Sequence, residues 1–175
     1  RDIVARCDDS VIRSLGGIPQ FIRRSRGYSS AAIRLAHAGP SVLAFGAHLK
    51  SSVCLTRGSE AFLSPHIGDL DNAATCAFFD ETVGRMLDLL EIKPEIVAHD
   101  LHPDYYSTRA AIEFAASHGL LTVAVPHHHA HIAAVCAEHG QRGPVLGLAL
   151  DGVGLGPDGE AWGGELLKVD AAQCE

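Results

Sequence analysis

Residues 41–64, which decide the fold, read SVLAFGAHLKSSVCLTRGSEAFLS. Residues 41–49 form an apolar run rich in small side chains, which is typical of a buried strand. Residues 51–56 predict a second strand, residues 57–60 a turn, and residues 61–64 a third strand that pairs back on the second. We therefore expect three antiparallel strands joined as a meander.

Helices and strands alternate downstream of this meander. Residues 72–91 carry apolar side chains three and four positions apart, which predicts an amphipathic helix. Pro94 follows the end of that helix, and residues 96–98 predict a short strand. Further along, we expect a helix from Ser107 or Thr108 to about Ser117 that Gly119 closes, a strand at 120–125, a helix at 127–138 closed by Gly140, a strand at 145–150 and a returning strand at 162–169.

This order of elements predicts an α/β fold. Three antiparallel strands followed by alternating helices and strands form a mixed sheet with helices on both faces. The order matches one lobe of the actin-like ATPase (ribonuclease H-like) fold, in which two lobes enclose a nucleotide. The hairpin at 145–169 then begins a second lobe.

The chain upstream of residue 40 differs from the rest in charge. Residues 1–34 hold seven arginines and three acids, a balance of +4, whereas the remainder holds seven basic and eighteen acidic residues, a balance of −11. Two short strands are expected within 11–24, around a Gly-Gly-Ile-Pro turn, and His37–Pro40 is interpreted as a linker. We therefore expect two units joined near residue 36.

The composition excludes several classes of protein. No run of eighteen apolar residues exists, which argues against a transmembrane helix, and the acidic body argues against a general nucleic-acid surface. The arginines at 23, 24 and 26 are suited to phosphates or to a solvated loop. Five cysteines without a C-x-x-C pair fit a reducing cytosol. Because the chain starts RDIVARCDDS, without Met, we expect it to begin inside a longer protein.

A histidine cluster at the start of the predicted helix 127–138 is the main candidate site. Residues four apart lie on one face of a helix, with Cβ atoms roughly 6 Å apart, so His127 and His131 can converge on one cation. His128 should point about 100° away, toward the stripe formed by Ile132 and Val135. A zinc protease would need a Glu after the first histidine, and His128 stands there instead.

The glycine-rich segment 148–165 follows this helix. Asp151 lies at the end of a predicted strand, twenty residues after His131, where it would complete an N/N/O metal site. The glycines would let backbone N–H groups approach phosphates, although an ordinary hairpin rich in glycine is the alternative. A dinucleotide fingerprint is rejected because Pro157 and Gly159 indicate a turn into a strand rather than the start of a helix. The donor set leaves zinc, iron and magnesium open.

The connection after strand 96–98 gathers further polar side chains. Loops at the carboxyl ends of strands are where α/β folds place ligands. Asp100, His102 and Asp104 are therefore candidates for orienting a ligand or a histidine. A capping or turn role for Asp104 and Ser107 is equally consistent with the local sequence.

Together these stretches resemble one family, the HypF-type hydrogenase maturation carbamoyltransferases. The histidine and glycine stretches alone match a broader superfamily. The presence of both HDLHPDY and IGDL narrows the resemblance to this one family. The segments that carry the resemblance are CDDSVIR (7–13), IRRSRGY (22–28), LSPHIGDL (63–70), AHDLHPDY (98–105), HHHAHIAA (127–134) and LDGVGLGPDG (150–159).

The resemblance implies a division of the chain and a set of functional residues. Residues 1–36 would end a YrdC-like domain that makes carbamoyl-adenylate from carbamoyl phosphate and ATP. Residues 37–143 would form the first lobe of the transferase domain, and residues 144–175 would begin its second lobe. The implied metal ligands are His127, His131 and Asp151, and Lys50 is the implied catalytic lysine. Of the candidates above, we expect Asp100 and His102 to be catalytic as well, and Gly152, Gly154, Gly156, Gly163 and Gly164 to bind the cofactor.

The resemblance also implies the reaction and its partners. A cytoplasmic enzyme of this family passes the carbamoyl group to the C-terminal cysteine of a partner maturation protein, using ATP and a divalent metal, and we expect no nucleic-acid or membrane partner. The alternatives are a tRNA threonylcarbamoyl transferase or O-carbamoyltransferase of the same superfamily, or a non-catalytic metal-binding assembly module. His48 and Ser51 depart from the family's usual Glu and Asn, and we expect the chain alone to be inactive.

Overall fold

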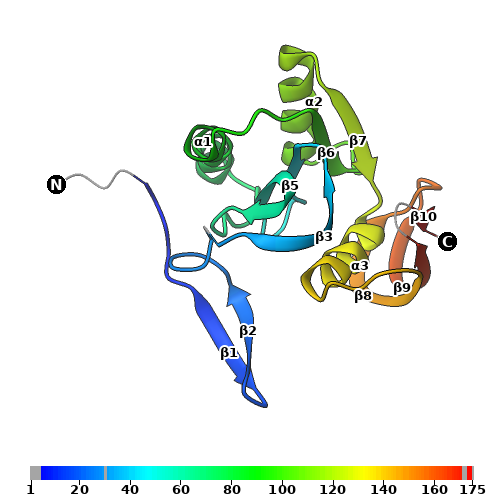
Figure 1. Cartoon of the computed structure of the whole chain (residues 1–175). Coiled ribbons are helices and arrows are strands. Elements are labelled where there is room, and N and C mark those ends of the chain that lie inside the picture. The colour runs from blue at the N-terminus through cyan, green and yellow to red at the C-terminus, as the bar shows by residue number, and fades with distance from the viewer. Residues whose placement is uncertain (1–4, 30, 171–172, 175) are drawn as a thin grey trace.

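The computed structural model describes residues 5–29, 31–170 and 173–174. That part of the chain forms a two-stranded, a five-stranded and a three-stranded sheet with helices between them (Figure 1). In chain order the elements are β1 (Val11–Leu15), β2 (Ile18–Arg23), β3 (Ile33–Gly39), β4 (Val42–Phe45), β5 (Val53–Leu63), α1 (Ala73–Leu90), β6 (Ile96–Asp100), α2 (Tyr106–His118), β7 (Leu121–Val125), α3 (His127–Glu138), β8 (Val145–Leu155), β9 (Ala161–Asp170) and β10 (Gln173–Cys174).

The central sheet is mixed, as expected. Its strand order is β3-β5-β4-β6-β7, with β5 antiparallel to both neighbours and β4, β6 and β7 parallel. The register pairs Asp100 at the end of β6 with Val125 at the end of β7. Because α3 begins two residues after Val125, this pairing brings Asp100 beside the first turn of α3.

The predicted meander is wrong in its details. Residues 57–60 form no turn, because β5 runs unbroken from Val53 to Leu63 and Gly58 pairs with Gly39 of β3. The expected linker His37–Pro40 is also wrong, since residues 37–39 belong to β3. Pairing with β3 satisfies the backbone of β5 where a turn was expected. The third antiparallel strand is therefore β3, and β4 ends at Phe45 rather than at residue 49.

The helices match their predicted positions more closely. Asn72 caps α1 by accepting a hydrogen bond from the backbone N–H of Thr75, and Gly119 closes α2 with a φ of 66°. The predicted cap of α2, Ser107 or Thr108, is wrong by two or three residues: Tyr105 is the N-cap residue, and Ser107 and Thr108 lie buried in the first turn. The helix over 127–138 is confirmed.

Helices lie on both faces of the central sheet. Phe45 of β4 packs against Phe79 of α1 and Phe114 of α2, so these two helices cover one face. Neighbouring residues of a strand point to opposite faces. Ala44 therefore faces the other side, where it lines a cavity together with Ala130 of α3.

Helix α3 also packs against the hairpin β8–β9. Ile132 of α3 forms a small buried cluster with Ala149 of β8 and Leu167 of β9. The opposite side of this hairpin carries leucines that are 63–80% exposed: Leu146, Leu148, Leu150 and Leu166. In the described part of the chain this apolar face has no covering element, which fits the expected start of a second lobe.

The N-terminal hairpin β1–β2 forms as predicted and stands away from the central sheet in Figure 1. Among the described residues, no helix is both long and apolar enough to cross a membrane. The four cysteines at 7, 54, 76 and 136 are free thiols.

Candidate metal centre

Two histidines at the start of α3 face each other as the helical spacing predicts. Pro126 turns the chain from β7 into α3, so His127 lies in the first turn and His131 one turn later. Their Nε2 atoms are 3.2 Å apart. Two imidazole nitrogens at this separation can bind one cation between them.

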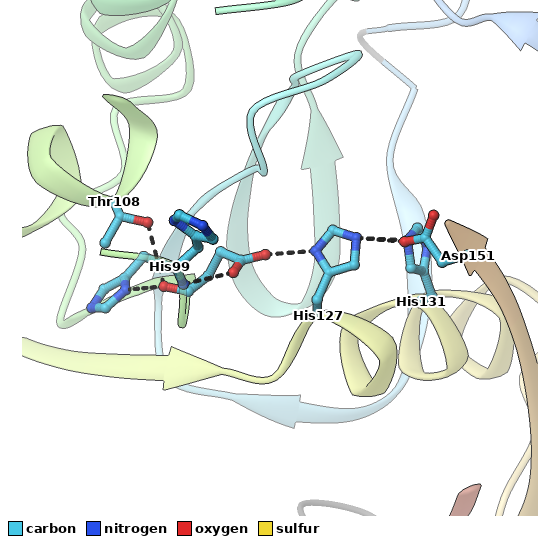
Figure 2. Close-up of polar contacts among 7 residues, drawn as sticks. His99, Thr108, His127, His131 and Asp151 are labelled. Atoms are coloured by element: carbon cyan, nitrogen blue, oxygen red, sulfur yellow. Dashed lines mark hydrogen bonds and ion pairs between the residues drawn. The ribbon is translucent and has the colours of Figure 1, made fainter. Parts of the chain in front are cut away.

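Asp151 adds a carboxylate to the pair from another element. The register of β8 against β9 shifts between Leu150 and Gly154, and this bulge contains Asp151. Its Oδ2 lies 2.8 Å from Nε2 of His127 and 3.3 Å from Nε2 of His131 (Figure 2). The bulge therefore presents a carboxylate to both rings.

The three ligand atoms fit a tetrahedral cation. With metal–ligand bonds of about 2.0–2.1 Å, neighbouring ligand atoms around a tetrahedral zinc lie about 3.3 Å apart. The observed separations of 2.8, 3.2 and 3.3 Å are close to that value. His127, His131 and Asp151 thus form a group that can hold a metal ion and leave a coordination position for a ligand.

Asp100 holds His127 in the orientation this site needs. Nδ1 of His127 donates a hydrogen bond of 2.6 Å to Oδ2 of Asp100, whose side chain is only 6% exposed. Nε2 faces the carboxylate of Asp151 at 2.8 Å, so a cation bound between them would take the place of a proton on Nε2, while Nδ1 keeps the proton that it donates to Asp100. Carboxylate–histidine pairs of this kind orient metal ligands in many proteins.

Asp100 is itself fixed by its surroundings. The backbone N–H of His102 donates to Oδ1 of Asp100 at 2.9 Å. The hydroxyl of Thr108 donates to the backbone oxygen of Asp100 at 3.3 Å, and Nδ1 of His99 lies 2.7 Å from the same oxygen (Figure 2). The polar chain thus runs from β6 and α2 through His127 to Asp151.

The pKa shifts follow from these contacts. The hydrogen bond to Asp100 raises the pKa of His127 above its usual value, although burial opposes it, and the carboxylate charges of Asp100 and Asp151 add to the rise. Burial alone would raise the pKa of Asp100, but the hydrogen bonds from His127 and His102 lower it overall. Burial likewise opposes the fall in the pKa of Asp151, which the Gly152 backbone and the two histidines bring about. A cation and a proton therefore compete for Nε2 of His127.

We expect Asp100→Asn to weaken zinc binding about 10–100-fold, the usual effect of losing a partner that orients a metal ligand. The amide removes the charge that holds Nδ1 protonated and the ring in place. Isothermal titration with zinc measures the effect, and Asp88→Asn, an exposed carboxylate on α1, is the matched control. Equal affinities for Asp100→Asn and the control would show that Asp100 does not position His127.

His102 and Lys50, two predicted catalytic residues, lie outside this polar chain as side chains. The ring of His102 stacks on Tyr105, with centroids 4.2 Å apart, so its link to the site is its backbone N–H. Lys50 lies elsewhere, in a pocket of about 170 Å³ that Ser52 also lines. Tyr105 and Thr108 were not predicted as part of the site, and Tyr105 also stacks on His48. The HDLHPDY segment carried the signal for Tyr105, whereas only the fold brings Thr108 to Asp100.

His128 points to the side of α3 that carries Ile132, as helical spacing predicts. Its side chain is fully buried beside Trp162 of β9, with ring centroids 6.1 Å apart, and Trp162 also packs against the buried cluster of Ile132. Gly154 passes directly over the rings of His127 and His128, where a Cβ atom would come within 2.8 Å of both side chains. The hairpin β8–β9 packs on top of the first turn of α3, and this covers His128.

The five glycines predicted to bind a cofactor differ from one another in how closely other atoms approach them. Gly154 is packed against His127 and His128, and Gly156 against Trp162, whereas Gly152 has open space at the position of a Cβ. Gly163 and Gly164 have only distant neighbours there. Close packing is thus an additional reason for glycine at 154 and 156, and Gly152, Gly163 and Gly164 leave backbone accessible.

A cavity of about 390 Å³ opens beside the histidines, between the central sheet and α3. His127, His131 and Asp100 line one side of it, and small residues such as Ala98 and Ala134 line the rest. The thiol of Cys54 also faces this cavity, and burial raises its pKa to about 11 although a hydrogen bond with the backbone of Phe62 opposes the rise. A small ligand in this space would lie next to the candidate metal ligands.

Comparisons with known proteins match both parts of this site. Residues 37–138 match the family model of the HypF Kae1-like domain, and residues 147–175 match that of the carbamoyltransferase Kae1-like domain, second subdomain. The first range contains His127 and His131, and the second contains Asp151.

Curated relatives and solved structures agree with the family models. The chain is 62% identical to the carbamoyltransferase HypF2 of Cupriavidus necator over 100% of this chain and 22% of the relative, and 52% identical to the carbamoyltransferase HypF of Rhizobium leguminosarum over 97% and 22%. A crystal structure of full-length HypF in a phosphate- and nucleotide-bound form superimposes with a TM-score of 0.91 at 44% identity, covering 100% of this chain and 23% of that one. HypF of T. kodakarensis gives 0.87 at 37% identity, covering 94% and 22%.

These likenesses extend beyond the fold to the sequence, and they confirm the resemblance and the actin-like lobe that it implies. The chain spans about a fifth of the length of these relatives. Because a HypF family model covers more than half of its residues, the chain belongs to the HypF carbamoyltransferase family.

Proposed function

We propose that this chain carries the metal-binding half of a carbamoyl-transfer site. In the proposed reaction, the carbamoyl group of carbamoyl-adenylate passes to the C-terminal cysteine of a partner maturation protein. The carrying observation is the convergence of His127, His131 and Asp151, with Asp100 behind His127. The C–S bond forms as the C–O bond to the adenylate phosphate breaks, and AMP leaves with the electron pair.

The residues of the site have separate tasks in this proposal. A divalent cation bound there supplies a Lewis acid for the carbamoyl carbonyl. His127, His131 and Asp151 bind and position that ion, and Asp100 accepts the proton of Nδ1 so that Nε2 of His127 faces the ion. The cavity beside the two histidines has room for a small acyl group, and its alanine lining limits the water around the reacting atoms.

The raised pKa of Cys54 favours an acceptor thiol that comes from outside the chain. A thiol attacks as the thiolate, and burial keeps the pKa of Cys54 near 11. Cys54 therefore stays protonated at neutral pH even though it lines the cavity, so a carbamoyl group there is not lost to the protein's own cysteine. This supports the proposal that the acceptor cysteine comes from a partner, and free thiols at four described positions fit the proposed cytoplasmic location.

We also propose the nucleotide and the domain division. Carbamoyl phosphate and ATP are the proposed sources of carbamoyl-adenylate, and a solved relative is described as phosphate- and nucleotide-bound. Residues 1–36 are proposed to end the domain that makes the adenylate, residues 37–143 to form the first transferase lobe, and residues 144–175 to begin the second. Separate family models for 37–138 and 147–175 support this boundary.

Removing the metal is the direct test. In the full-length protein, a chelator should abolish carbamoyl transfer to a peptide that ends in cysteine, and added zinc or iron should restore it. Carbamoyl-adenylate formation, measured as release of pyrophosphate, should continue throughout. Transfer that persists in chelator would exclude a metal-dependent site, and metal binding without any transfer would favour the non-catalytic assembly module.

A further inference from the structure

Three aromatic side chains from two separate loops form a stack close to Asp100. The ring of Tyr105 stacks on the ring of His102, with centroids 4.2 Å apart and 5° between the ring planes. It also stacks on the ring of His48, with centroids 5.5 Å apart and 22° between the planes. We call these three side chains the ring stack. It joins the loop between β4 and β5 to the loop between β6 and α2.

One end of the ring stack reaches the metal centre through Asp100. The backbone N–H of His102 donates to Oδ1 of Asp100 at 2.9 Å, while Oδ2 accepts from Nδ1 of His127 at 2.6 Å. The ring of His102 is also tied to its own loop, because its Nδ1 accepts from the backbone N–H of Asp104 at 3.3 Å. A shift of this loop would therefore move Asp100 and, with it, the ring of His127.

The other end of the ring stack is anchored by His48. Its backbone oxygen accepts a hydrogen bond of 2.9 Å from the N–H of Leu70. A hydrogen bond of 3.0 Å from the N–H of Gly46 to the backbone oxygen of Ser52 closes the loop that carries His48. A Cβ atom at Gly46 would collide with that oxygen, so the ends of the loop approach as closely as glycine permits. His48 therefore presents its ring from a fixed backbone.

The face of the His48 ring makes this contact, and Nδ1 has no part in it. Nδ1 of His48 is buried and has no hydrogen-bond partner in the described part of the chain. Contact between ring faces depends on an aromatic side chain, and a phenyl ring can make it as well as an imidazole. Glutamate, the usual residue of the family at this position, has no ring. The contact with Tyr105 is therefore a consequence of histidine at position 48.

Electrostatics place the hydroxyl of Tyr105 near the carboxylates of the metal centre. Burial raises the pKa of Tyr105, and the negative charges of Asp100 and Asp151 raise it further. Charges in salt solution act mainly over about 10 Å or less. The middle of the ring stack thus lies close to Asp151, a candidate metal ligand, as well as to Asp100.

We propose that His48 is a positioning residue of the metal centre. Its ring fixes Tyr105 and, through Tyr105, the loop of His102. That loop in turn holds Asp100 against His127. The inference deepens the proposed function and rests on it for the bound metal alone, because it requires neither carbamoyl transfer nor an acceptor thiol.

Cobalt(II), bound in place of zinc by the full-length protein, tests this role. The visible absorption of tetrahedral cobalt(II) depends on how its ligands are arranged, so a spectrum at saturating cobalt reports geometry separately from affinity. Subtracting the spectrum of His127→Ala isolates the signal of this site. His48→Gln, which lacks the ring, should change the spectrum and weaken cobalt binding by about two- to tenfold, the factor that one aromatic contact contributes to an equilibrium. His48→Phe should restore both, and His37→Ala, at an exposed histidine of β3, should change neither.

Tyr105→Leu breaks the ring stack from its centre and should reproduce the effects of His48→Gln. The double variant should resemble Tyr105→Leu alone, because both substitutions remove the same contact. Circular dichroism checks that each variant is folded. An unchanged spectrum and affinity in both single variants would overturn the proposal, and so would a loss in His48→Phe as large as in His48→Gln.

Failure of this inference can be told apart from failure of the proposed function. If the unsubstituted protein transfers carbamoyl groups and neither ring-stack variant alters cobalt binding, the inference alone fails. If the variants alter cobalt binding as expected and the unsubstituted protein transfers no carbamoyl group, the proposed function alone fails.

Discussion

Replacing His127 or His131 with alanine in the full-length protein is expected to abolish carbamoyl transfer and to spare carbamoyl-adenylate formation. Each substitution removes one of three ligand atoms that lie within 4.8 Å of one another. Loss of an orienting partner alone typically costs 10–100-fold, so loss of a ligand should reduce transfer by at least about a hundredfold. His127→Ala should have the larger effect, because it also leaves the buried carboxylate of Asp100 without its hydrogen bond.

Transfer is measured with a peptide acceptor, and adenylate formation by pyrophosphate release in the same sample. His139→Ala is a suitable control, because His139 is an exposed histidine at the other end of α3. Zinc titration of each variant links any loss of transfer to the loss of the ion. Full transfer in both His127→Ala and His131→Ala would remove the metal from the mechanism.

The fold could be predicted from sequence wherever one element has its own local signal. The apolar spacing over 72–91 predicted α1, and Gly119 predicted the end of α2. Residues 57–60 contain Gly58 and look like a turn, but pairing with Gly39 on β3 keeps them within β5. That pairing depends on a segment almost twenty residues away, so no local pattern at 57–60 carries it.

At the metal site, too, local sequence patterns did not predict the contacts between separate elements. Helical spacing alone brought His127 and His131 together, because both residues lie on one helix. Asp100 reached the candidate set as a loop residue, yet its contact with Nδ1 of His127 depends on the parallel register of β6 and β7. Helical spacing also placed His128 on the face of Ile132, but the burial of His128 beside Trp162 depends on the hairpin β8–β9 folding over α3, which helix geometry cannot reveal. Contacts between elements thus separate the predicted site from the observed one.

Gly154→Ala is expected to disrupt the metal site although residue 154 is no ligand. A Cβ atom there would lie 2.7 Å from Cε1 of His128 and 2.8 Å from two side-chain atoms of His127, well inside the 3.5–4.0 Å of normal carbon contacts. His128 is fully buried and His127 is held by Asp100, so neither ring can retreat freely. The hairpin must shift instead, and Asp151 moves with it. We expect zinc affinity to fall by at least about tenfold and stability by about 1–3 kcal/mol.

Gly152→Ala separates this packing argument from a role in binding phosphate. The two glycines lie on the same strand and neither has a positive φ, but a Cβ at 152 would meet open space. Zinc titration and thermal unfolding should therefore leave Gly152→Ala near the unsubstituted protein and Gly154→Ala far below it. If these glycines serve mainly to let backbone N–H groups approach a nucleotide, the accessible Gly152 should be the more sensitive, with nucleotide affinity falling and zinc affinity unchanged. Equal zinc affinities in the two variants would show that α3 and the hairpin yield more easily than their contacts imply, and that Asp151 does not depend on Gly154 for its position.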